Sequence, residues 1–499
     1  MILSLVLTLN LLFASTTVAF TTQTPPPSHT KTFTTKNFSP NSLKMSSTTT
    51  TNNNSNDTNP KPKLPLPEPL RSLTPGTWAY DTMSRRIDSE ILERTFTENK
   101  DEFTNDPKFR KAYENFKLLR QDLQNASNTK LRQLYPLPDH MMKNDENAVQ
   151  EYNEWSEILK PYVDNSDTWL SAPWMVAEFY LYRRLMEALE YFDPQAPTYL
   201  FDPFAKQKRA GLHSSVSTAD PILKQIETLS TKSIEDGFGL AAAFALWGNK
   251  MDLSIWPTEQ NDNIPGMFQK ILASANDNLL HDDTDALVQH GKDLLAKGGG
   301  NVDIVIDNAG FELIMDLALG DYLIASKIAS KVTFQLKSHP TFVSDALEKD
   351  LLQHVTYYAN DIDGTKFPFA KAAGERWQTY LDEGKWVCNE DSFWVQPPPM
   401  WEMPNKLRNN MKERCELAFI KGDANYRRLL GDLEWDFSAP FEDVVGYYFP
   451  CPVCALRTLK AEVGCGMEKE KVDNAKAVDD NWLVNGRFGV VHFSKGSTQ

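Results

Sequence analysis

The chain has 499 residues, of which 41% are hydrophobic and 24% are charged, and its formal net charge is −15. This composition is that of a globular protein with a sizeable core, and the length suits two domains. The negative charge argues against nucleic acid as a partner, because a phosphate backbone needs a basic protein face. An anionic substrate would therefore need locally placed Lys and Arg side chains, or a metal ion.

The N-terminal 65 residues have the pattern of a presequence and a disordered linker. The first twenty, MILSLVLTLNLLFASTTVAF, are uncharged and largely apolar, with a small-residue cleavage region near Ala19. They resemble a secretory-type signal rather than a stable membrane span, and the acid-free, Ser/Thr-rich residues 21–56 resemble a transit peptide. This order resembles the bipartite presequences of complex plastids, so a plastid location is favoured over secretion. Initiation at Met45 would instead give a cytoplasmic protein.

Helical spacing dominates residues 66–235, which we expect to form a helical domain. The segment SAPWMVAEFYLYRRLMEALEYF, residues 171–192, shows this spacing best, and Pro173 suits its first turn. Its apolar side chains fall on one helix face. Arg183 and Arg184 lie beside that face, and the simplest expectation is that they are solvated.

Residues 236–499 have a different pattern, in which short strands alternate with helices. The predicted strands are VDIVI at 302–306, VTFQL at 332–336, ELAFI at 416–420 and GVVHF at 489–493. Alternation of this kind predicts a parallel or mixed sheet in a three-layer α/β/α domain.

A polar cluster follows each of three predicted strands. Asp307 and Asn308 follow the first, the segment KSHPTFVSD ending at Asp345 follows the second, and KGDANYR follows the third. The carboxyl ends of parallel strands meet at one edge of a sheet, where ligands bind. Carboxylate and amide oxygens suit Mg²⁺ or Mn²⁺. Alternatively, Asp307 and Asn308 cap the following helix.

Two other enzyme classes have short matches that their sequence context contradicts. The segment DIDGT, residues 361–365, resembles a haloacid-dehalogenase nucleophile motif, but helical spacing precedes it where a strand is needed. The segment VDIVIDNAG resembles part of a short-chain dehydrogenase, but the glycines at 298–300 precede its strand instead of following it.

Four segments together resemble the damage-control phosphatase family: DNAGFELIMDLAL at 307–319, VSD at 343–345, IKGDANYRRLLGD at 420–432 and RTLK at 457–460. Their order and spread make the likeness specific, and it extends from about residue 70 to 495. The last segment matches the Arg-Thr-x-Lys motif of sugar phosphate phosphatase subfamily III, which includes acidic-residue methyltransferase-like proteins.

This resemblance implies a helical N-terminal domain packed on a Rossmann-like α/β/α domain. It implies a phosphatase that depends on Mn²⁺, with Co²⁺, Ni²⁺ or Mg²⁺ as alternatives, and that hydrolyses sugar phosphates such as fructose 1-phosphate or fructose 6-phosphate. Asp307, Asn308 and Asp345 would hold the metal, and the two aspartates would act in catalysis, with either an aspartate or a metal-bound water as nucleophile. The substrate would bind to Asp307, Asn308, Asp423, Ala424, Asn425, Tyr426, Arg427 and Lys460.

The chemistry of these residues agrees with phosphate transfer, because a metal ion with Arg and Lys can neutralise charge as the P–O bond breaks. Lys421 could join this phosphate clamp, and Arg427 could pair with Asp423 at helical spacing. Arg457 and Lys460 would share one face if CALRTLKAEV, residues 454–463, is helical.

Two alternatives come from other functional classes. One is S-adenosylmethionine-dependent methylation of protein carboxylates, although no Gly-rich loop follows the first strand of the α/β region. The other is a non-catalytic sugar-phosphate binder.

Overall fold

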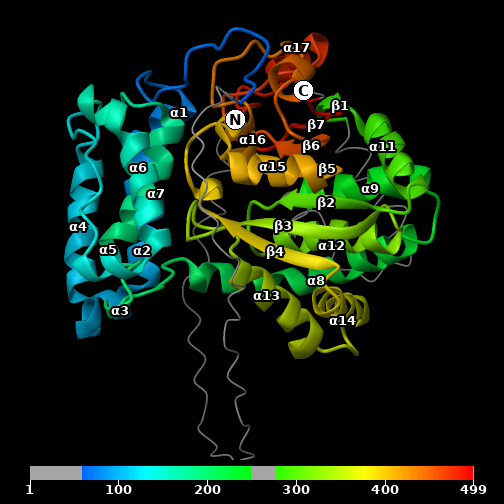
Figure 1. Ribbon diagram of the computed structural model, residues 1–499, viewed down its shortest axis with the longest axis horizontal. Coiled ribbons are helices and arrows are strands. Elements are labelled where there is room, and N and C mark those ends of the chain that lie inside the picture. The colour runs from blue at the N-terminus through cyan, green and yellow to red at the C-terminus, as the bar shows by residue number, and fades with distance from the viewer. Residues whose placement is uncertain (1–58, 249–276, 498–499) are drawn as a thin grey trace, which may run out of the picture. The chain divides into compact units, whose positions relative to one another are not determined.

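The computed structural model describes residues 59–248 and 277–497, and Thr58–Gln499 form one compact unit (Figure 1). The predicted presequence lies outside the described residues, apart from residues 59–65. None of the described helices combines the length and apolar character that a membrane crossing needs.

The N-terminal part of the described chain is helical, as predicted. Local caps explain several boundaries: the Asp145 side chain accepts a hydrogen bond from Ala148 N, and that of Ser233 accepts one from Asp236 N. The helices are α1 (Trp78–Asp81), α2 (Glu93–Glu98), α3 (Lys100–Asn105), α4 (Arg110–Gln124), α5 (Asp139–Asn144), α6 (Glu146–Asp164), α7 (Trp174–Ala188), α8 (Ala205–Leu229) and α9 (Ile234–Trp247), with a π-helical stretch at Thr82–Leu92.

Helix α7 is buried on nearly every side, and the prediction that Arg183 and Arg184 are solvated is wrong. Arg183 donates to both carboxylate oxygens of Glu151, at 2.6 and 2.9 Å. Arg184 donates to the hydroxyl of Tyr180 at 2.9 Å and to Asp122 at 3.2 Å. The helix is enclosed by its neighbours, so its polar side chains are paired inside the protein.

A mixed sheet of seven strands follows, in the order β1-β7-β6-β5-β2-β3-β4. All neighbouring strands are parallel except β6 and β7. The four predicted strands are confirmed. The strands are β1 (Leu279–Asp282), β2 (Gly300–Val305), β3 (Ala329–Lys337), β4 (Trp386–Asp391), β5 (Leu417–Lys421), β6 (Val453–Thr458) and β7 (Gly489–Ser494).

The remaining helices connect these strands. They are α11 (Thr284–Ala296), α12 (Phe311–Ala325), α13 (Glu348–Thr356), α14 (Pro368–Asp382), α15 (Asn405–Arg414), α16 (Asp423–Leu429) and α17 (Lys469–Val478). Residues 361–365 begin with the last residue of the π-helical turn Tyr357–Asp361, which continues α13, so a helix and not a strand leads into them, as predicted.

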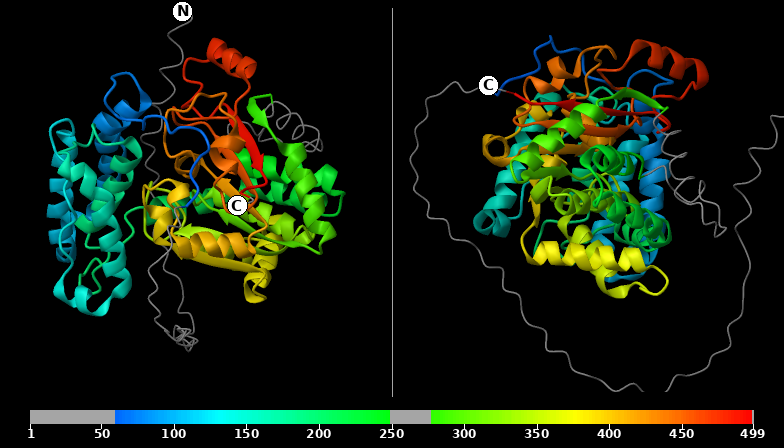
Figure 2. Two further views of the ribbon diagram at one scale, coloured as in Figure 1. Left: turned by 45° about the horizontal axis from the view of Figure 1, so that its top comes forward. Right: turned by 90° about the vertical axis from the view of Figure 1, so that its right-hand side faces the viewer.

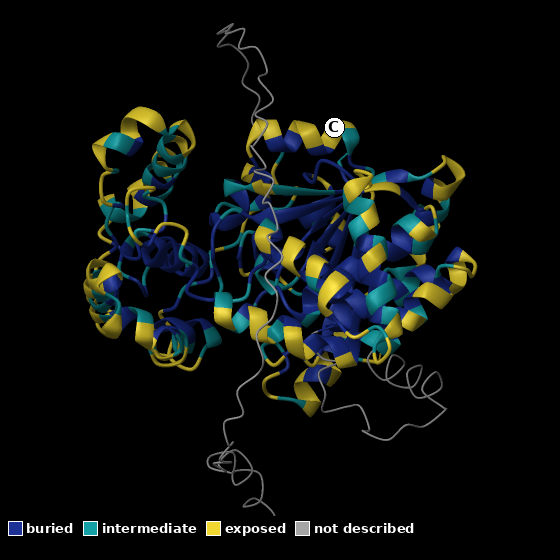
Figure 3. Cartoon of the chain, turned by 90° about the horizontal axis from the view of Figure 1, so that it is seen from below, coloured by how far each residue is buried: buried dark blue, intermediate teal, exposed yellow. Residues whose placement is uncertain are grey.

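The sheet separates two hydrophobic cores, because alternate residues of a strand point to opposite faces. In β5, Leu417 and Phe419 join the core formed with α8, α9 and α11–α14. Ala418 and Ile420 join the other core, which contains residues of α1, α3, α4, α6, α7, α15 and α16. Helices therefore cover both faces, which gives the three-layer α/β architecture with a helical N-terminal region (Figure 2). The strands are buried between helices whose outer sides are exposed (Figure 3).

The boundary predicted at residue 235 stays a prediction. Helix α8 lies before that boundary, yet it packs against α12 and α14 beneath the sheet. The helical region is thus continuous with the α/β core through α8.

Candidate active site

The carboxyl ends of β2 and β3 bring Asp307, Asn308 and Asp345 together. Asn308 and Asp345 form an isolated antiparallel bridge, and Ala346 N donates to the carbonyl oxygen of Asp307 at 2.9 Å. The capping alternative is wrong, because α12 begins at Phe311 after Gly310 and has no side-chain cap. The two side chains at 307 and 308 are therefore available for a site.

Two carboxylate oxygens of this cluster lack hydrogen bonds within the described part of the chain. They are Asp307 Oδ1 and Asp345 Oδ2, the latter 3.3 Å from Lys337 Nζ. Burial, with the carboxylates of Asp345 and Glu312 nearby, raises the pKa of Asp307. Burial raises the pKa of Asp345 to about 6, although the Lys337 ammonium opposes this shift. Buried carboxylate oxygens without hydrogen bonds fit a divalent cation.

Asn308 completes the cluster with its amide. Its Nδ2 donates to Asp307 Oδ2 at 3.0 Å and to Glu312 Oε2 at 2.8 Å, and its Oδ1 accepts from Ser344 Oγ at 2.6 Å. These bonds set the orientation of the amide. Glu312 and Ser344 were missed by sequence reasoning, although Glu312 follows Asn308 at the helical spacing of four. Among the described residues no three His, Cys, Asp or Glu side chains form a metal cluster, so the amide would be the third ligand.

The turn between β5 and α16 closes one side of the cluster. Gly422 has φ +82°, and a Cβ there would lie 1.9 Å from Asp307 Oδ2, so only glycine allows this approach. Asp423 follows, and it accepts hydrogen bonds from Arg457 Nε at 2.8 Å and Lys460 N at 3.1 Å. The predicted pairing of Asp423 with Arg427 is therefore wrong, because Arg457 lies in β6 and takes that place.

The helical alternative for CALRTLKAEV is also wrong, since residues 453–458 form β6, between β5 and β7. Arg457 is fully buried, whereas Lys460 lies beyond the strand and is exposed. The backbone N of Lys460 bonds to Asp423, the residue after Gly422, whose Cα lies against Asp307, so Lys460 follows the turn that closes the cluster. Lys460 is thus a cation at the site that solvent and ligands can reach.

Three other predicted substrate ligands on α16 have partners inside the protein. Asn425 Oδ1 accepts from Lys337 Nζ at 2.9 Å, and the Tyr426 hydroxyl lies 3.2 Å from His492 Nδ1. Arg427 lies over the ring of Trp174 at 3.6 Å, and its two carboxylate partners are described below. Their assignment as substrate ligands, like that of the half-buried Ala424, stays a prediction.

Lys421 points away from the cluster and into the core beneath the sheet. Its Nζ donates to the carbonyl oxygen of Ala245 and lies 3.1 Å from Asp316 Oδ1. Burial raises the pKa of Asp316 to about 7 despite this ion pair. The location of Lys421 argues against the phosphate-clamp role considered for it.

Comparison with known proteins identifies relatives of the chain. The family model of the damage-control phosphatase ARMT1-like domain matches residues 82–475. Damage-control phosphatase ARMT1 of Mus musculus is 32% identical over 372 residues, which cover 72% of this chain and 82% of that protein. The Homo sapiens protein of the same name is 30% identical over 442 residues, which cover 84% of this chain and 96% of that protein. A crystal structure of a DUF89 family protein from Pyrococcus horikoshii covers 65% of this chain and 87% of its own, with 17% identity and a TM-score of 0.36.

Proposed function

Because the chain belongs to the damage-control phosphatase ARMT1-like family, we propose that it is a metal-dependent phosphatase acting on small phosphorylated sugars, such as fructose 1-phosphate and fructose 6-phosphate. The observation that carries this proposal is the pair of buried carboxylates, Asp307 and Asp345, each with an oxygen that lacks a hydrogen bond to the described residues. The exposed Lys460 is tied by its backbone to Asp423 in the neighbouring turn. The Arg-Thr-x-Lys segment at 457–460 supports assignment to subfamily III.

The cluster would hold a divalent cation through Asp307, Asn308 and Asp345. When bound, such a cation supplies charge neutralisation for the phosphoryl group and its leaving oxygen. Lys337 holds Asp345 in place by its ion pair, while Glu312 and Ser344 orient the Asn308 amide.

Lys460 would bind the phosphate as a compact point charge. Asp423 positions the backbone of Lys460 and is itself held by Arg457. In a protein of net charge −15, this cation gives a local attraction for a phosphate dianion that the surface as a whole does not give.

The experiment uses the full chain, treated with a chelator and then supplied with Mn²⁺, Co²⁺, Ni²⁺, Mg²⁺ or Ca²⁺. We expect phosphate release from fructose 1-phosphate to disappear with the chelator and to return more fully with the transition ions than with Ca²⁺. Asp307→Ala and Asp345→Ala should lose most of the rate while remaining folded, and exposed Lys469→Ala is the control.

The same preparations distinguish the other functional classes. Methyl transfer from S-adenosylmethionine to protein carboxylates without phosphate release would favour the methyltransferase, and tight sugar-phosphate binding without turnover would favour a binder. Full phosphatase activity in chelator, with no metal in the protein, would contradict the proposed metal site.

A further inference from the structure

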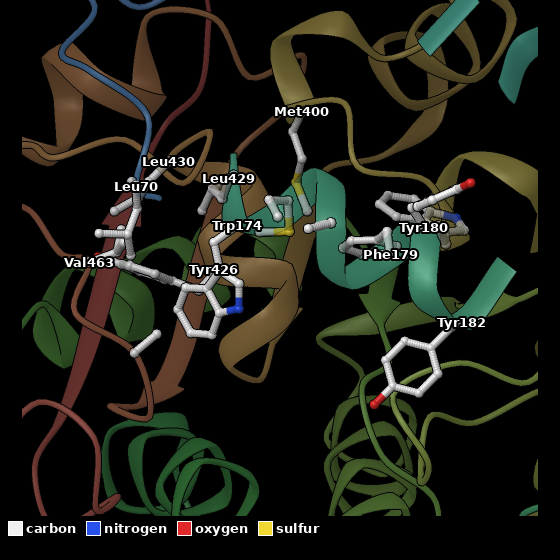
Figure 4. Packing of buried hydrophobic residues seen from close by; sticks show 14 of the residues in the cluster. Leu70, Trp174, Phe179, Tyr180, Tyr182, Met400, Tyr426, Leu429, Leu430 and Val463 are labelled. Carbon is white, nitrogen blue, oxygen red and sulfur yellow. The ribbon is translucent and has the colours of Figure 1, made fainter. Parts of the chain in front are cut away.

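One face of helix α7 is directed toward the candidate active site. Trp174, Glu178 and Tyr182 are spaced by four residues and therefore share a face. Trp174 lies against the guanidinium of Arg427, and Glu178 Oε2 accepts from Arg427 Nη1 at 2.6 Å. Because Arg427 belongs to α16, these contacts bring α7 against the helix that starts beside Asp307. Figure 4 shows Trp174 beside Tyr426 and Leu429.

Tyr182, one turn further along this face, packs on the loop that carries Asp345. Its ring centre lies 4.9 Å from that of Phe342, three residues before Asp345. Phe342 and Val343 have φ +44° and +68°, a left-handed conformation that a β-branched residue rarely adopts. The Tyr182 ring therefore helps to enclose the turn that places Asp345.

The hydroxyl of Tyr182 has no hydrogen-bond partner among the described residues, although the residue as a whole is only 2% exposed. In Figure 4 this hydroxyl points away from Phe179 and Tyr180, whereas the Tyr180 hydroxyl donates to the carbonyl oxygen of Arg132 at 2.7 Å. This hydroxyl is not among the fully buried, unpartnered side-chain atoms of the described residues, so it keeps some contact with solvent and is free to donate to an acceptor from outside the chain.

The surroundings of this hydroxyl keep it protonated. Burial and the negative charges of Glu178 and Asp345 raise the pKa of Tyr182 well above its ordinary value, while Arg86 acts in the opposite direction. Two carboxylates nearby disfavour a phosphate dianion at this position, but they do not repel a neutral hydroxyl group.

We propose that Tyr182 contacts the substrate and donates a hydrogen bond to a hydroxyl oxygen of its sugar part. This inference rests on the proposed function, and it adds a substrate-contacting residue from the helical region to a site otherwise built from the sheet. The phosphate binds at Lys460 and the carboxylate cluster, and Tyr182 selects for a polyhydroxylated leaving group.

The test compares Tyr182→Phe with Tyr322→Phe in the full chain. Tyr322 is a matched control, because it is 1% exposed, makes no hydrogen bond to another described residue, and lies in the last turns of α12, away from the site. Tyr182→Phe should lower kcat/KM for fructose 1-phosphate about tenfold, the effect of one lost neutral hydrogen bond. Its activity on p-nitrophenyl phosphate, which has no sugar hydroxyl, should change by less than about twofold.

A second measurement is independent of turnover. Calorimetric titration of fructose 1-phosphate into chelator-treated protein should show a Kd about tenfold higher for Tyr182→Phe, with an unchanged Tm. If Tyr182→Phe leaves the kinetics and the Kd for fructose 1-phosphate unchanged in an active enzyme, the role of Tyr182 is overturned and the proposed function is kept. Equal losses of activity on fructose 1-phosphate and p-nitrophenyl phosphate would have the same meaning. A wild-type protein that binds fructose 1-phosphate but releases no phosphate would overturn the proposed function, while the Kd comparison would still decide the role of Tyr182.

Discussion

Replacing Asp345 by asparagine should stabilise the metal-free protein at neutral pH. The wild-type fold buries this carboxylate next to Asp307, and burial raises its pKa from 3.8 to about 6. The folded state therefore binds a proton more tightly than the unfolded state does. As the pH rises from about 4 to above 6, ionisation of Asp345 progressively lowers the free energy of unfolding.

The size of this effect follows from the pKa. With a pKa raised from 3.8 to about 6, ionisation of Asp345 lowers the free energy of unfolding by about 3 kcal/mol at pH 7.5 and by about 1 kcal/mol at pH 4.5, relative to an uncharged side chain. Asparagine carries no charge at either pH. Lys337 loses an ionic partner in the variant but keeps its hydrogen bond to Asn425, so we expect a net gain of about 1–2 kcal/mol at pH 7.5.

The assay is urea unfolding of wild type and Asp345→Asn in chelator at both pH values. Asp473→Asn, at an exposed position on α17, is the control. Adding Mn²⁺ should stabilise the wild type more than the variant, because the cation binds to the folded carboxylates. A loss of stability at pH 7.5, or a gain that is equally large at pH 4.5, would refute the reasoning.

Two further predictions concern cations near the site. Lys460→Ala should raise KM and lower kcat/KM for fructose 1-phosphate by about 10² or more. Steady-state kinetics check this against Lys469→Ala at an exposed position, and equal, small effects of the two substitutions would contradict it. Arg427→Met should lower the free energy of unfolding by about 3–5 kcal/mol, because it leaves two buried carboxylates unpaired. Arg428→Met should change the free energy of unfolding by about 1 kcal/mol or less. Within the described part of the chain this buried guanidinium donates only to the carbonyl oxygen of Pro398, and burial lowers its pKa to about 9. Similar losses for both variants in urea unfolding would be inconsistent with this difference.

Local patterns in the sequence were sufficient to locate the strands and the polar clusters after them. The apolar runs at 302–306 and 332–336 are strands because their residues are buried on both faces, and their length excludes a long helix. Once two such strands are parallel neighbours, their carboxyl ends coincide, so the polar segments that follow them lie at one edge of the sheet. Asp307 and Asn308 are placed by the end of β2, whereas Asp345, eight residues beyond β3, also depends on the turn at Phe342 and Val343.

The directions of the long side chains depended on the tertiary structure. Arg427 is paired with Glu178, 249 residues earlier in the chain, and this contact decides that its guanidinium is buried. Arg457 lies in a strand because β5 and β7 flank it, although its spacing from Lys460 also suited a helix. Tyr182 belongs to a helix whose spacing showed an apolar face but not what that face would meet. Sequence spacing determines which residues share a face, whereas the partner of a long polar side chain is set by segments that only the folded chain brings together.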